Sequence, residues 1–143
     1  MKFNHFFVAI LSIGLLFASC KKNTPAPTTP TATVDANESK NNAISANSWT
    51  VTSYTENGQE RMQSALNSFT MTYKKEDKNN GTATWALIDL QGGSQNVSDK
   101  YEIRNNGTEI DLGGDILGFT VSGSSLTIEG NYNGTAVRIV AKK

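Results

Sequence analysis

The amino-acid sequence predicts an all-β domain, a small antiparallel up-and-down β-barrel of about eight strands, behind a signal peptide and a disordered tether. From Ser48 onward, apolar side chains alternate with polar ones, as in strands with one buried face. Four Asn-Gly dipeptides separate the alternating runs, and this dipeptide supplies the positive φ angles of tight hairpin turns. A sandwich is the alternative fold. Nearest-neighbour hairpins favour the barrel, whose closure also removes exposed sheet edges.

The first nineteen residues (1–19) are typical of a signal peptide. Lys2 gives a positive start, and the apolar run 6–18 has about thirteen residues, the length of a signal-peptide core. A helix that spans a bilayer needs about twenty apolar residues. The sequence therefore predicts a cleaved leader and no permanent transmembrane helix.

The only cysteine, Cys20, directly follows the small residues Ala18 and Ser19. This exit resembles the lipobox of bacterial lipoproteins, with Phe17 standing where a leucine is usual. The resemblance implies that the Cys20 thiol receives a diacylglyceryl group and that Cys20 becomes the first residue of the mature chain. Two or three acyl chains would then anchor the protein stably, where a single chain would be marginal.

The segment 20–47 is rich in Thr, Pro and Asn and holds all three prolines. It has almost no large apolar side chain, so it cannot bury enough surface to order itself. The sequence predicts that it is a disordered linker between the lipid on Cys20 and a folded domain over 48–143.

The first predicted strand places Trp49, Val51 and Ser53 on one face and Tyr54 on the other. The segment 60–67 is the one piece that fits a short helix, and this helix would cover one end of the fold. Seven more alternating runs complete the eight strands. The expected inward side chains are Trp49, Val51, Phe69, Met71, Tyr73, Trp85, Leu87, Tyr101, Ile103, Ile110, Leu112, Leu117, Phe119, Val121, Leu126, Ile128, Val137 and Ile139.

The opening Asn47-Ser48-Trp49, a Phe-rich second strand over 69–73 and a second tryptophan, Trp85, resemble the lipocalin-like lipoprotein domains common in Bacteroidetes. The resemblance covers residues 46–143. In true lipocalins a late arginine packs on the first tryptophan, which helps to close the barrel. The resemblance therefore implies that Trp49 closes the barrel and makes Arg138 the candidate partner, although the alternation points Arg138 outward.

Two interiors are open for such a barrel. An eight-stranded barrel is just wide enough to be filled by side chains or to hold one small molecule. Six aromatic side chains in the inward set favour a filled core. The alternative is an apolar pocket near one mouth, lined by Trp85, Tyr73 and Phe119, for a lipid or an aromatic ligand.

The composition excludes the common catalytic arrangements. The only histidine, His5, lies in the leader, and the only thiol, on Cys20, is expected to carry lipid. Ser-His, Cys-His and His-metal chemistry are therefore absent from the predicted mature chain. A carboxylate pair for glycoside chemistry could come only from acidic residues at turns and outward positions, which are Asp89, Asp111, Asp115 and Glu129. We expect no catalytic residues, cofactor or metal.

The sequence thus predicts a membrane-anchored, monomeric, non-catalytic lipoprotein whose barrel binds a small hydrophobic ligand or an envelope partner. The alternative is an inhibitor or envelope-assembly accessory with a filled barrel that acts through its loops. The formal net charge of +0 gives no basic excess for nucleic acid. We expect a location at the outer membrane. Lys21 and Lys22 follow Cys20 in place of the acidic residues of surface-export signals, which favours the periplasmic face.

Overall fold

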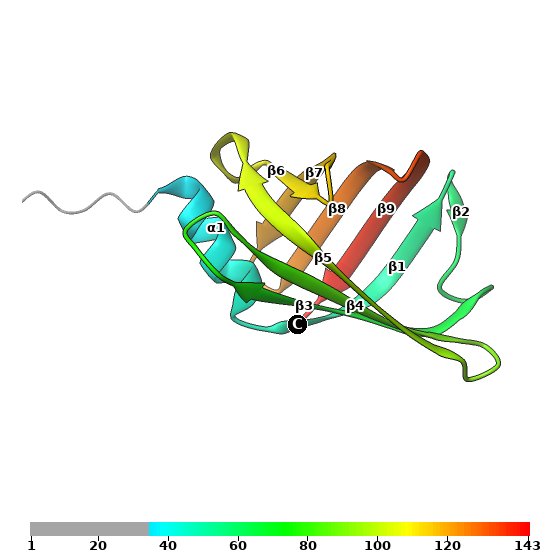
Figure 1. The fold of residues 1–143 in the computed structure, drawn as a ribbon. Coiled ribbons are helices and arrows are strands. Elements are labelled where there is room, and N and C mark those ends of the chain that lie inside the picture. The colour runs from blue at the N-terminus through cyan, green and yellow to red at the C-terminus, as the bar shows by residue number, and fades with distance from the viewer. Residues whose placement is uncertain (1–34) are drawn as a thin grey trace, which may run out of the picture. The chain divides into compact units, whose positions relative to one another are not determined.

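The computed structural model describes residues 35–143, which form one helix, one short 3-10 segment and nine strands (Figure 1). The predicted signal peptide and Cys20 lie outside the described residues. The elements are α1 (Ala36–Ser45), β1 (Ser48–Glu56), β2 (Gln59–Glu60), β3 (Leu66–Lys75), β4 (Asn80–Asp89), β5 (Ser94–Arg104), η1 (Asn105–Gly107), β6 (Glu109–Leu112), β7 (Asp115–Ser122), β8 (Ser125–Tyr132) and β9 (Thr135–Lys142). Within the described part of the chain, no helix has the length and apolar character of a membrane span.

The strands form a closed antiparallel barrel. The order in the sheet is β2-β1-β3-β4-β5-β6-β7-β8-β9, and β9 pairs back with β1. Eight strands therefore close the barrel, and the two-residue β2 is an extra strand on the end of β1. The predicted antiparallel eight-stranded barrel is confirmed, and closure by β1 and β9 rules out the sandwich.

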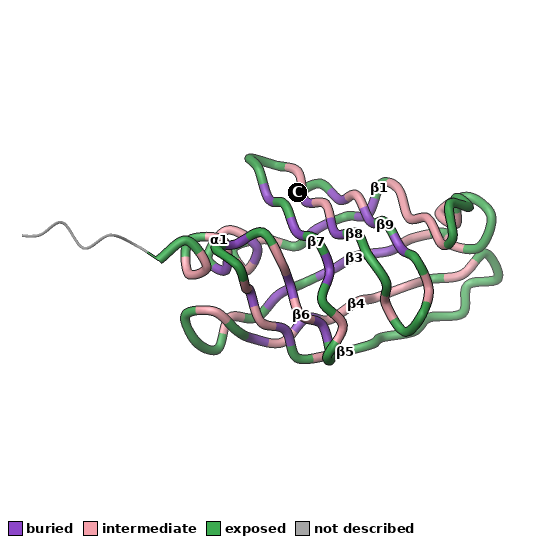
Figure 2. Tube along the Cα trace, turned by 90° about the horizontal axis from the view of Figure 1, so that it is seen from above, coloured by how far each residue is buried: buried purple, intermediate pink, exposed green. Residues whose placement is uncertain are grey.

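The inward side chains fill the barrel. Nearly every residue of the expected inward set is buried, and Trp85 and Leu87 are half-buried against the same core. Figure 2 shows the buried positions recurring along the strands and on α1. Ile44, Ala83 and Ala141 complete the set of buried apolar residues. The preference for a filled interior agrees with this packing.

A β-bulge in β1 changes which side chains reach the core. Val51 pairs with Ala141, but the next pair along β9 is Ser53 with Val140, so Thr52 is the extra residue. One extra residue reverses the alternation beyond it. Tyr54, expected on the outer face, consequently packs against the core and meets the ring of Phe69 edge-on, with centroids 5.6 Å apart.

The short helix predicted over residues 60–67 is wrong. Glu60 pairs with Thr55 in β2, and its carboxylate accepts hydrogen bonds from Ser53 Oγ at 2.8 Å and from the Met62 N–H at 2.9 Å. These bonds hold the chain in a turn. Within it, the N–H groups of Ala65 and Leu66 both donate to Arg61 O, at 2.9 Å and 3.2 Å. The turn still lies at one end of the barrel.

Asn-Gly dipeptides form the hairpin turns at Asn57-Gly58 and Asn133-Gly134, where all four φ angles are positive. Asn80-Gly81 is an exception, because both residues lie inside β4. A Cβ at Gly81 would come within 2.8 Å of the Tyr101 ring and 2.1 Å of Lys74 O. Glycine is therefore needed at this position for close packing instead of a turn.

The last part of the predicted disordered linker, 20–47, contains a helix. The helix α1 occupies Ala36–Ser45, inside the predicted linker, and packs against the barrel. The helix begins with the Asp35 carboxylate accepting from the Asn37 N–H at 2.8 Å, a standard N-cap. It buries only Asn41 and Ile44 completely. Because the helix buries only two side chains, most of its sequence is polar. The composition of this segment therefore predicted disorder.

Candidate functional site

The two ends of the barrel differ, and α1 closes one of them. The helix packs against β3, β5, β7 and η1 (Figure 1). Trp49 is fully buried under it and donates its indole N–H to Ile44 O at 2.9 Å. Lys143 Nζ lies 5.8 Å from the centre of the Trp49 ring. We call this the closed end.

Asn41 connects α1 to the barrel. Its side-chain amide donates to the backbone oxygens of Asp77 at 3.0 Å, Lys78 at 3.1 Å and Asn80 at 3.2 Å. Its carbonyl oxygen accepts from the Tyr101 hydroxyl at 2.5 Å. The side chain is completely buried, so these bonds satisfy the whole amide in a dry environment. Asn41 thus makes a polar connection that holds α1 over the closed end.

The opposite end carries the turn after β2 together with the β4–β5, β6–β7 and β8–β9 turns. A hollow of about 280 Å³ lies there, lined by Tyr54, Glu56, Arg61, Ala65, Leu66 and Leu87. We call it the mouth hollow. A smaller one of about 100 Å³ shares Leu66 and Leu87 with it and is otherwise lined by Asp89, Gly93 and Gln95. The two hollows have a common apolar floor.

A small polar cluster borders the mouth hollow. Glu56 accepts from the Tyr54 hydroxyl at 2.5 Å and from Arg61 Nε at 3.1 Å. Burial of the phenol, its hydrogen bond to Glu56 and the charge of that carboxylate raise the pKa of Tyr54 well above its usual value. The phenol is therefore protonated at neutral pH. The hollow combines an apolar floor with one hydroxyl, one carboxylate and one guanidinium.

A row of aromatic rings leads from the mouth hollow across the open end. Phe69 lies 5.6 Å from Tyr54 and 5.9 Å from Trp85, and Trp85 lies 5.3 Å from Tyr132, all between ring centroids. Tyr54, Trp85 and Tyr132 are only half-buried and pack on the core. Aromatic surface at a barrel mouth suits an apolar or aromatic ligand.

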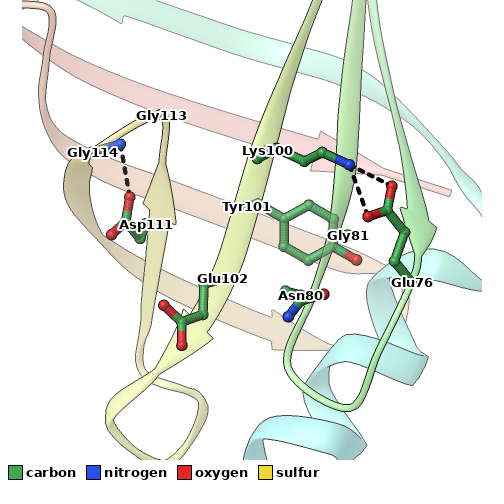
Figure 3. Close-up of a pocket in the computed structure, with 9 residues that line it drawn as sticks. All are labelled: Glu76, Asn80, Gly81, Lys100, Tyr101, Glu102, Asp111, Gly113 and Gly114. Atoms are coloured by element: carbon green, nitrogen blue, oxygen red, sulfur yellow. Dashed lines mark hydrogen bonds and ion pairs between the residues drawn. The ribbon is translucent and has the colours of Figure 1, made fainter.

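A further hollow, of about 530 Å³, is a groove on the outside of the barrel (Figure 3). Its acidic side chains already have cationic or backbone partners. Lys100 Nζ bonds Glu76 at 2.7 Å, and Arg104 bridges Glu102 at 2.7 Å and Asp111 at 2.8 Å. Exposed pairs of this kind are common surface features of small energetic value. The groove is therefore a weaker candidate than the smaller mouth hollow.

The residues predicted to line a ligand pocket are not gathered around one hollow. Tyr73 and Phe119 are 4% and 3% exposed and belong to the core. Burial, with a further contribution from the neighbouring Tyr101, raises the pKa of Tyr73 above its usual value. Trp85 alone reaches towards the open end. Arg138 points outward, pairs with Glu129 at 3.2 Å and does not pack on Trp49.

Sequence reasoning named Tyr54 and Tyr132 only as candidates for an exposed aromatic patch, and it missed Leu66 as a residue of the mouth hollow and Asn41 as the residue that holds the closed end. The inward turn of Tyr54 could not be predicted, because the bulge at Thr52 cannot be seen in an alternating pattern. Leu66 lies in the segment 60–67, for which the sequence predicts a helix instead of a turn and the start of β3. The run Asn41-Asn42 gave no signal, since its role depends on backbone oxygens thirty-odd residues away.

The four carboxylates weighed as acid/base candidates all take part in turn or surface bonds. Asp89 accepts from the Gly93 N–H, Asp111 from the Gly114 N–H, Asp115 from the Asn133 N–H, and Glu129 from Arg138. Within residues 35–143, no group of three or more His, Cys, Asp or Glu side chains is placed to hold a metal ion.

Comparison with known proteins bears on the fold. No protein-family model and no curated protein matches the sequence. A redesigned β-barrel is similar, with a TM-score of 0.54 and 11% identity over 73% of this chain and 94% of that one. A lipocalin lipoprotein affecting virulence in Streptococcus pneumoniae matches with a TM-score of 0.39 and 16% identity over 68% of this chain and 89% of that one. The first likeness confirms the barrel. The Bacteroidetes resemblance stays a prediction.

Proposed function

We propose that this protein is a lipid-anchored, non-catalytic binding protein whose mouth hollow takes a small hydrophobic ligand. The observation that supports it most is the contrast between a filled interior and an open apolar hollow at the end that α1 leaves uncovered. The described chain enters the barrel at the closed end, so the open end carries no attachment. Cys20, outside the described residues, would supply the membrane anchor in the cell envelope, at the periplasmic face of the outer membrane.

The size and chemistry of the hollow define the ligand class. About 280 Å³ lies at the lower limit for small-molecule pockets. A filled barrel leaves no room inside for a long acyl chain, so the ligand is a compact aromatic or branched aliphatic group, or the end of a longer molecule. Leu66 and Leu87 would contact the apolar part, while Arg61 would favour a negatively charged or hydrogen-bond-accepting end.

A fluorescent probe with this chemistry, anilinonaphthalene sulfonate, tests the proposal. We expect the wild-type protein to bind the probe and Leu87→Glu to bind it about tenfold more weakly, because a buried carboxylate replaces the apolar floor. Ile116→Glu is the matched control, since Ile116 is 53% exposed on the outer face of β7. Both variants should unfold cooperatively on heating. Equal probe affinity in all three proteins would contradict a site at the mouth hollow.

The second candidate is an inhibitor or envelope-assembly accessory that acts through its loops. It is favoured by the exposed apolar side chains of the β4–β5 hairpin, where Ile88 is 37%, Val97 44% and Leu90 52% exposed. This candidate requires no small molecule. Probe binding that Leu90→Ser abolishes and Leu87→Glu does not affect would favour it over the mouth hollow.

A further inference from the structure

The wall of the barrel is incomplete beside β5. The strand β4 pairs with β5 over Ser94–Glu102, whereas β6 pairs with it only over Tyr101–Arg104. β6 and β7 turn back at Gly113 and Gly114, and the Gly113 N–H donates to Lys100 O at 3.1 Å. Among residues 35–143, no strand pairs with Ser94–Asp99 on the side away from β4 (Figure 1). We call this segment the open edge.

The direction of the backbone groups along the open edge follows from the hydrogen bonds at its end. Lys100 O points towards β6, because it accepts from Gly113. Ile103, of the opposite parity, donates to Asn79 O on the β4 side. In an antiparallel strand, the N–H and C=O of one residue point to the same side, and every second residue repeats this direction. Ser94, Asn96 and Ser98 therefore direct their N–H and C=O groups to the open side.

Most of the open edge lacks the usual protection against pairing. Natural edge strands carry lysine or proline, point charges inward, contain a bulge, or are very short. Asp99, at the end of the open edge, is its one inward-pointing charge. The sequence from Gln91 to Ser98 contains no charged residue and no proline. The pairing of β5 with β4 runs from Ser94 to Glu102 without a register shift. The segment is therefore a regular strand whose outward N–H and C=O groups can pair with an additional strand.

The inner face beside the open edge is partly apolar and partly acidic. Val97 shares this face with its partner Trp85 and is nevertheless 44% exposed. The carboxylates of Asp99 and Asp115 both lie near Tyr132, where their charges add to the effect of burial in raising the pKa of its phenol. Within the described part of the chain, neither carboxylate forms an ion pair. A neighbouring strand would meet an apolar position and, two residues on, a negative one.

We propose that the open edge binds an extended peptide segment of a partner protein by strand addition, in line with β6. Backbone hydrogen bonds to Asn96 and Ser98 would hold the peptide, an apolar side chain would cover Val97, and a basic side chain two residues away would pair with Asp99 and Asp115. Strand addition of this kind takes affinity from the main chain and specificity from alternate side chains.

A second copy of this chain fits the open edge less well. In an antiparallel pairing of two copies, Asp99 of one copy would lie towards the Ser94 end of the other, where the sequence 91–98 offers no basic side chain to pair with it. The edge is also too short to bury the roughly 1,200 Å² of total surface that stable interfaces need. A basic, extended peptide would supply a charge partner for Asp99. It would also need less buried area, because its binding is transient.

The test uses a fluorescein-labelled peptide, Ser-Thr-Val-Thr-Arg-Thr-Ser, and the protein described here. Fluorescence anisotropy should detect binding to the wild-type protein that weakens with added salt. Asn96→Pro and Ser98→Pro each remove one outward N–H and should weaken binding about tenfold. Asn96→Ala and Ser98→Ala are the matched controls, because they change the same side chains and keep the N–H. The alanine variants should bind as the wild type does.

A second measurement does not depend on the folding of the proline variants. The same peptide, N-methylated on alternate residues, cannot complete the main-chain bonds and should not bind the wild-type protein. Amide hydrogen exchange at Asn96 and Ser98 should be fast in the free protein and slow with the unmethylated peptide. Absence of binding, equal affinity of the methylated peptide, or equal affinity of the proline variants would each overturn the proposal. Slow exchange in the free protein together with self-association would assign the edge to a second copy instead.

Discussion

Asn41 is the residue on which the closed end depends most. We expect Asn41→Ala to lower the free energy of unfolding by about 3 kcal/mol, because three backbone oxygens and the Tyr101 hydroxyl lose a buried partner at once. Urea unfolding followed by circular dichroism measures the change. The neighbouring Asn42→Ala is the control. The side-chain oxygen of Asn42 accepts an exposed hydrogen bond from Lys75, and its loss should cost less than about 0.5 kcal/mol. Similar losses in both variants would contradict this role.

The tyrosines make the stability of the domain sensitive to high pH. Burial raises the pKa of all four, and that of Tyr101 to about 12. A tyrosine in the unfolded chain has a pKa of about 10. Stability from these groups is therefore complete below pH 10 and is lost as the pH rises through about 12, because the unfolded chain releases protons that the folded chain retains.

The measurement is urea unfolding at a series of pH values, together with the absorbance of tyrosinate. We expect a constant urea midpoint from neutral pH to about 10 and a steady fall above it, with tyrosinate absorbance rising only as the protein unfolds. Tyrosinate absorbance that rises near pH 10 in the folded protein would show that the phenols are accessible, and the expectation would then be wrong.

At the scale of elements, α1 is part of the folded domain. A chain that begins at Asp35 should unfold at the same urea concentration as the protein with residues 1–34, whereas a chain that begins at Ser48 should unfold at a lower one. Ile44→Ala should cost about 2 to 4 kcal/mol, because its side chain is fully buried on Trp49 and the core. Equal midpoints for the two shortened chains would mean that α1 contributes nothing to the fold.

The strands could be predicted from sequence and α1 could not, for one physical reason. A strand that lines a filled barrel alternates apolar inward side chains with polar outward ones. Residues such as Phe69, Met71 and Tyr73 therefore indicate the strand from the local sequence alone. The helix α1 contributes only Asn41 and Ile44 to the interior, and the value of Asn41 depends on backbone oxygens of the β3–β4 turn. No local pattern contains that information.

The candidate site was harder to predict than the fold. Inward position alone selected Tyr73 and Phe119, which are core residues. The residues of the mouth hollow depend on the bulge that turns Tyr54 inward and on the turn that replaces the expected helix before Leu66. Both are irregularities, and irregular backbone follows from side-chain bonds such as those of Glu60 instead of from periodicity.

At the scale of the whole molecule, the proposed function combines a lipid anchor on Cys20 with a barrel that α1 covers at one end. We expect Cys20→Ala to abolish fatty-acid labelling and to release the protein from the membrane fraction, since lipid on this thiol would be its attachment. Cell fractionation and labelling measure this. Ser19→Ala, which keeps a small residue before the cysteine, is the control and should remain in the membrane. A Cys20→Ala protein that stays in the membrane fraction would contradict lipid anchoring.

We propose that the filled barrel binds a small apolar ligand at the mouth opposite α1. Native mass spectrometry of the protein purified from membranes tests this binding, with wild type, Leu87→Glu and Ile116→Glu prepared in parallel. We expect wild type and Ile116→Glu to carry the same small molecule and Leu87→Glu to have lost it. Three proteins that carry no small molecule, or three that carry it equally, would contradict the claim.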